Sequence, residues 1–81
     1  MDLEVVHVGG QKLTAKVIGF SERALFIKFP QSLTSVYMLR VNTNRFTGLP
    51  NWKAADHERV REVYRLLTKE RNERIKEGRY A

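Results

Sequence analysis

Cysteine is absent from this chain of 81 residues, tryptophan occurs once, and proline and methionine occur twice each. Without cysteine the chain forms neither a disulfide nor a thiolate metal site. No apolar run approaches the roughly 18 residues that a membrane-spanning helix requires. Residues 1–4, Met-Asp-Leu-Glu, lack the basic and apolar regions of a signal peptide. We therefore expect a cytoplasmic protein with no membrane partner.

The shortness of the chain predicts a single domain over residues 1–81. A domain of this size buries a modest core, and small domains often gain stability from a disulfide, a metal or a second subunit. Because disulfides are excluded, a homodimer stays an open alternative.

The first fifty residues have the β-branched, alternating character of strands. Two such runs, residues 3–8 and 13–20, flank Gly9-Gly10, and this pattern predicts a β-hairpin. Residues 24–29 predict a third strand that Pro30 ends, with Gln31-Ser32 as a loop. Residues 36–41 predict a fourth strand, and residues 45–47 a short fifth strand after an Asn-rich turn at 42–44.

The second half of the chain, residues 54–78, changes to the period of a helix. Four apolar residues recur at i, i+3, i+4 and i+7, namely Val60, Val63, Tyr64 and Leu67. Asp56 is placed to cap the helix and Gly78 to end it, so we expect a helix over about 55–77. The apolar stripe stops after Leu67, which predicts a charged and exposed helix end.

These elements predict an α+β fold, in which one long C-terminal helix packs on a four- to five-stranded antiparallel meander or small barrel over residues 1–50. The predicted core comprises one face of each strand and the helix stripe: Val5, Leu13, Ala15, Val17, Leu25, Ile27, Phe29, Tyr37, Leu39, Val41, Val60, Val63, Tyr64 and Leu67. In architecture this arrangement resembles the small RNA-binding barrels of the SH3-like or Sm-like kind. No sequence motif of those families accompanies the resemblance, which rests on the order of the elements alone.

Catalytic patterns are incomplete in this sequence. His57-Glu58 lacks the second histidine of a metalloprotease motif, and His57 and Asp56 are adjacent on a helix, so they do not face each other as a triad with Ser21 requires. A metal site built from both histidines would need His7 to converge with His57 and a carboxylate. We expect a non-catalytic protein with no cofactor and no metal site.

Positive charge is the feature that stands out most, because 15 Lys and Arg outnumber 9 Asp and Glu and give a net charge of +6. Such a charge favours DNA, RNA or an acidic protein surface as a partner, although it also lies in the range that serves solubility. Residues 24–51 contain three cations and no acidic residue. Cations bind phosphates, and aromatic rings stack on bases.

The leading hypothesis is therefore a nucleic-acid-binding module or regulator. Its predicted contact residues combine cations with rings in or beside this acid-free stretch: Lys16, Lys28, Arg40, Arg45, Phe26 and Phe46. Rings at alternating strand positions are also typical of a core, and Tyr37 is assigned to the core on that ground. Trp52 lies just beyond the stretch and is left unassigned.

The charged helix end supports an alternative, a protein-binding regulator or inhibitor. Its cations are the predicted partner-binding residues: Lys69, Arg71, Arg74, Lys76 and Arg79. They alternate with Glu70, Glu73 and Glu77, so the segment carries 5 − 3 = +2. Alternating signs are typical of a solvated helix face or a protein interface more than of a phosphate-binding tail. In this alternative, the helix and an exposed sheet face contact an acidic protein surface.

Overall fold

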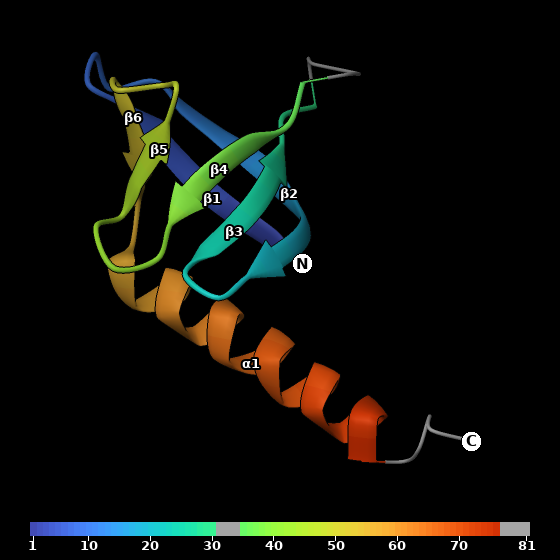
Figure 1. The fold of residues 1–81 in the computed structure, drawn as a ribbon. Coiled ribbons are helices and arrows are strands. Elements are labelled where there is room, and N and C mark those ends of the chain that lie inside the picture. Colours follow the sequence, from blue (N-terminus) through green and yellow to red (C-terminus); the bar gives the residue numbers. More distant parts are fainter. Residues whose placement is uncertain (31–34, 77–81) are drawn as a thin grey trace.

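A computed structural model describes residues 1–30 and 35–76 of the chain (Figure 1). In these residues the strands, in chain order, are β1 (Asp2–His7), β2 (Lys12–Ser21), β3 (Ala24–Lys28), β4 (Tyr37–Arg40), β5 (Arg45–Thr47) and β6 (Trp52–Ala54), followed by the helix α1 (His57–Lys76). The strands form a closed antiparallel barrel in sequence order. Figure 1 shows α1 lying across one end of the barrel and continuing beyond it.

The predicted α+β fold is confirmed, but the sheet has six strands instead of four or five. The additional strand is β6, which pairs with β1 through Val5↔Ala54, Val6↔Lys53 and His7↔Trp52. It also meets β5 through Arg45↔Lys53, and these two pairings close the barrel. A strand of three residues between a turn and a helix cap is too short to show a two-residue period, so the sequence did not reveal it.

Tight turns connect the strands at the predicted places. Gly10 has φ +94° and donates its N–H to the carbonyl of His7 at 2.8 Å. Asn44 has φ +59°, and its Nδ2 donates to the carbonyl of Ala54 at 3.1 Å. Because Asn tolerates the left-handed region better than most residues, it turns the chain between β4 and β5 and also ties that turn to β6.

The core fills the barrel and its helix-covered end. Most of the predicted core residues are buried: Val5, Ala15, Val17, Leu25, Ile27, Phe29, Leu39, Val60 and Val63. The other predicted members are partly buried against them: Leu13, Tyr37, Val41, Tyr64 and Leu67. Leu3, Phe46 and Ala54 join this core without having been predicted. Full burial of a Leu, Val or Phe side chain contributes about 1.5–3 kcal/mol, so this core is the main source of stability.

The helix α1 begins where the capping pattern predicts. The Oδ1 atom of Asp56 accepts a hydrogen bond from the N–H of Glu58 at 2.9 Å, which satisfies a donor of the first turn. Tyr64 fixes the helix to the β2–β3 hairpin, because its hydroxyl donates to the carbonyl of Glu22 and its ring meets the Phe20 ring edge-on at 6.0 Å. The loop expected at Gln31-Ser32 and the helix end expected at Gly78 lie outside the described residues.

The second half of α1 lies on the surface, as predicted. Every residue from 69 to 76 is exposed, and the helix there extends past the barrel (Figure 1). In the described part of the chain, no helix is long and apolar enough to cross a membrane.

Candidate functional site

The antiparallel register sorts the outward-facing residues of the barrel into rows that cross the strands. Inward and outward side chains alternate along a strand, and Leu25, Ile27, Leu39 and Phe46 are buried, so their neighbours on β3, β4 and β5 face outward. One such row contains consecutive register partners: Gly19, Phe26, Met38 and Thr47. This row therefore places an aromatic ring beside a flexible apolar side chain on the outer surface.

A second row, two residues further along the strands, is basic. Arg40 on β4 is opposite Arg45 on β5, and Arg45 is opposite Lys53 on β6. All three side chains are exposed. Neighbouring strands lie about 4.7–4.9 Å apart, so three positive charges project from consecutive positions of one row.

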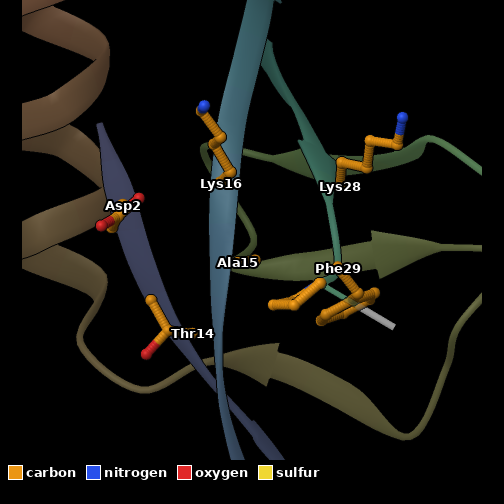
Figure 2. Close-up of a pocket in the computed structure, with 7 residues that line it drawn as sticks. Asp2, Thr14, Ala15, Lys16, Lys28 and Phe29 are labelled. Carbon is orange, nitrogen blue, oxygen red and sulfur yellow. The ribbon is translucent and has the colours of Figure 1, made fainter. Parts of the chain in front are cut away.

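A third group of cations flanks the aromatic row on its other side. Lys28 lies two residues after Phe26 on β3, and its register partner on β2 is Lys16. Figure 2 shows both lysine side chains extending away from Phe29 at one side of a pocket. The pocket is also lined by Thr14, Ala15 and Pro30 and by Asp2, which is the register partner of Lys16 on β1.

We call the outward residues of these strands the β3–β6 face: Phe26, Lys28, Met38, Arg40, Arg45, Thr47 and Lys53. The four strands contain no Asp or Glu. The ion pairs formed within residues 1–30 and 35–76 are Arg59–Glu62 at 2.5 Å and Arg74–Glu70 at 2.6 Å, and both lie on α1. Acidic side chains lie at the borders of the face: Glu22 in the β2–β3 turn lines a pocket together with Met38 and Arg40.

The ring of Phe26 is partly exposed and rests over a glycine. A Cβ atom at position 19 would lie 3.8 Å from Cδ2 of Phe26, an ordinary van der Waals distance, so the ring lies beside the β2 backbone at Gly19. The Phe26 side chain is half-buried, so part of it is accessible from the outer surface of the barrel.

Phe46 corrects the predicted contact set. Its side chain is 5% exposed, and its ring centroid lies 6.0 Å from that of Phe29 in the core. The two-residue period turns Phe46 inward between the outward Arg45 and Thr47, so the ring cannot stack on a base. Trp52 is also turned inward and partly buried, with its ring centroid 5.6 Å from Phe29 and 5.0 Å from His7.

The basic row continues with two lysines that were not among the predicted contact residues. Lys53 extends it on β6, and Val6 on β1 connects Lys53 to Lys12, because Val6 is the register partner of both. Lys53 was missed because β6 itself was not predicted. Lys12 lies one residue before the predicted second strand, and only the register places it near Lys53.

Two of the predicted partner-binding residues on α1 already interact with neighbouring side chains. The Arg71 guanidinium lies 5.0 Å from the centroid of the Phe20 ring, and the Nη2 atom of Arg74 pairs with Glu70. Arg71 thus contacts the barrel through the Phe20 ring, whereas Arg74 is paired within the helix and is exposed. Lys69 and Lys76 are exposed, and Arg79 lies outside the described residues.

A groove runs between β2 and the second half of α1. A bulge in the β2–β3 pairing occurs between Val17 and Gly19 and leaves the Ile18 side chain 48% exposed. The groove is lined by Val17, Ile18, Gly19, Phe20, Leu67, Glu70, Arg71 and Arg74. Its floor is apolar and its helix wall carries two arginines and one glutamate.

The histidines occupy separate structural positions. The Nδ1 atom of His7 accepts a hydrogen bond from the N–H of Gly9 at 3.1 Å, and Nε2 of His57 accepts one from Nε of Arg61 at 3.2 Å. Within residues 1–30 and 35–76, no three side chains of His, Cys, Asp or Glu lie close enough to hold a metal ion.

Comparison with models of known protein families, with curated proteins and with solved structures found no significant match to this chain. The function is therefore inferred from the geometry of the chain's own residues.

Proposed function

We propose that this protein is a small, non-catalytic nucleic-acid-binding protein that contacts the phosphate backbone through its β3–β6 face. The observation that carries the proposal is the row Arg40–Arg45–Lys53, three cations at consecutive register positions on strands without any acidic residue. Four of the predicted contact residues, Phe26, Lys28, Arg40 and Arg45, lie on this face, and Lys16 lies beside Lys28.

The row is unfavourable for the isolated protein. Like charges directly opposite each other on neighbouring strands are destabilising, and Arg40↔Arg45, Arg45↔Lys53 and Lys16↔Lys28 are three such pairs. A net positive charge that serves only solubility is better dispersed, because dispersed cations avoid this repulsion. A polyanion relieves the repulsion and gains from releasing its condensed counterions, so the arrangement favours a phosphate backbone as the ligand.

The proposal has two broader parts. The small closed barrel is similar in plan to SH3-like and Sm-like barrels, and that likeness of fold supports RNA or DNA binding only by analogy. We also propose a cytoplasmic location and a regulatory role, in which the small domain acts by occupying a nucleic-acid segment.

The test compares two variants with equal net charge. Arg40→Gln/Arg45→Gln/Lys53→Gln removes the basic row, and Arg65→Gln/Lys69→Gln/Lys76→Gln removes three exposed cations of α1. Fluorescence anisotropy with labelled single-stranded DNA, duplex DNA and RNA at low salt should show strong loss of binding for the first variant and a small loss for the second. Equal losses would mean that binding follows net charge alone, and no binding by the wild-type protein would refute the proposal.

A second candidate function is suggested by the groove between β2 and α1. Its apolar floor with Ile18 and its wall with Arg71 and Arg74 complement an extended protein segment that carries apolar and acidic side chains. Titration with synthetic peptides of alternating Glu and Leu should then give binding that Ile18→Ser and Arg71→Gln abolish. If both variants bind the peptides as tightly as the wild-type protein does, the groove is not a protein-binding site.

A further inference from the structure

The β3–β6 face has an internal order that a simple basic patch lacks. Its apolar row, Phe26 and Met38, lies between Lys28 on one side and the Arg40–Arg45 pair on the other. The rows are two residues apart along each strand, or about 6.6 Å. Cation, ring and cation thus follow one another across a short stretch of surface.

Phosphate contacts alone do not need a ring at the centre of this face. An exposed aromatic ring adds binding energy where it meets the flat face of a base, and each base has such a face in any sequence. In a duplex the base faces are stacked on one another, and proteins read bases through the groove edges with a helix, a ribbon or an arm. In the described residues the β3–β6 face is the outer surface of strands in a closed barrel, so it presents no helix, ribbon or arm that could enter a groove.

From this arrangement, and resting on the proposed nucleic-acid-binding function, we infer that the β3–β6 face binds single-stranded nucleic acid, with one base stacked on Phe26 and the flanking phosphates on Lys28 and the Arg40–Arg45 pair. Met38 lies beside the ring and extends the apolar platform toward the next base.

The ring is held close to the neighbouring strand. The Cδ2 atom of Phe26 lies 3.8 Å from where a Cβ atom on Gly19 would stand, which is an ordinary van der Waals distance, so the ring has the β2 strand beside it. A ring that is already held in place loses little conformational freedom when a base stacks on it. The competing explanation is that Phe26 only shields the glycine, and in that case removal of its π-face would leave binding unchanged.

The experiment replaces the π-face while keeping the cover over Gly19. Phe26→Leu retains an apolar side chain, and Phe26→Trp retains an aromatic one. Anisotropy titrations would use a labelled 12-nucleotide single strand and the duplex of the same sequence, with circular dichroism confirming that each variant is folded.

Phe26→Leu should weaken binding of the single strand about 5- to 150-fold, the range expected for one base–aromatic stack, and leave duplex binding within about twofold of wild type. Phe26→Trp should keep single-strand affinity, and its added indole fluorescence should be quenched on binding. This variant keeps the inference testable even if Phe26→Leu unfolds.

Two results would overturn the inference while leaving the proposed function intact: unchanged single-strand affinity in Phe26→Leu, or duplex binding as tight as single-strand binding in the wild-type protein. Failure of the proposed function looks different, because then neither form of nucleic acid binds the wild-type protein in a salt-dependent way. A Phe26→Trp variant that binds the single strand without any change in fluorescence would also contradict stacking at this position.

Discussion

Arg45 is the middle cation of the basic row, and its replacement should raise stability while it lowers binding. In Arg45→Gln two like-charge pairs disappear, with Arg40 and with Lys53. If the flexible side chains hold their charges about 8 Å apart, the repulsion in water is about 0.5 kcal/mol per pair. Both pairs together therefore destabilise the free protein by at most about 1 kcal/mol at low ionic strength.

The repulsion also fixes how the effect depends on salt. The Debye length falls from about 30 Å at 0.01 M to about 10 Å at 0.1 M and 3 Å at 1 M, so the gain in stability should shrink as salt rises. For a domain of this size, 1 kcal/mol corresponds to about 4–8 °C in Tm, so the rise in 0.01 M salt should be at most about 4–8 °C. Thermal unfolding followed by circular dichroism at 0.01 M and 1 M salt measures both quantities.

Arg65→Gln is the matched control. Arg65 is exposed on α1 and borders a pocket with Asp56, Glu58 and Glu62, so its charge has acidic neighbours. Its removal should leave Tm unchanged or lower it slightly, because helix charge pairs contribute about 0.2–0.5 kcal/mol. A lower Tm for Arg45→Gln in low salt, or a gain in Tm that persists in 1 M salt, would refute the claim that like-charge repulsion within the basic row destabilises the free protein.

Three further predictions concern the fold that presents this face. Leu25→Ala should lower the free energy of unfolding in urea denaturation by about 2–5 kcal/mol, because Leu25 is fully buried. The control Leu66→Ala, at a position 43% exposed, should change it by less than about 0.5 kcal/mol. Similar losses at both positions would contradict the assignment of Leu25 to the core. Asp56→Ala should cost about 0.5–2 kcal/mol through loss of the helix cap, and an unchanged Tm would show that the bond to the Glu58 N–H adds nothing. Asn44→Ala should lower Tm more than Asn44→Gly, because both variants lose the hydrogen bond to Ala54 but only glycine tolerates the positive φ. Equal losses would mean that the destabilisation comes from the hydrogen bond alone.

Local patterns in the sequence predicted most of the fold. The hairpin around Gly9-Gly10, the turn at Asn44 and the cap at Asp56 follow from residues within a few positions of each other. The helix stripe was equally readable because its period repeats over two turns. The three-residue strand β6 has too few residues to show a period, and with it the closure of the barrel escaped prediction.

The candidate site depends on pairing between strands, which a single sequence does not show. Lys28, Arg40 and Arg45 are apparent as an acid-free basic stretch, but that Arg45 stands between Arg40 and Lys53 follows only from the register. Phe46 was predicted as a contact residue because it lies in the acid-free basic stretch, whereas the two-residue period of β5 turns it into the core. The groove at Ile18 arises from a bulge, a feature of the pairing between β2 and β3 and not of either strand alone.

The salt dependence of single-strand binding tests the central claim most directly. For single strands, log K falls with log salt by about 0.7 per phosphate neutralised. If the basic row contacts phosphates, the Arg40→Gln/Arg45→Gln/Lys53→Gln variant should show a slope shallower than wild type by about 2, and the Arg65→Gln/Lys69→Gln/Lys76→Gln variant should keep the wild-type slope. Equal slopes for wild type and the first variant would contradict the account, because the row would then release no counterions on binding.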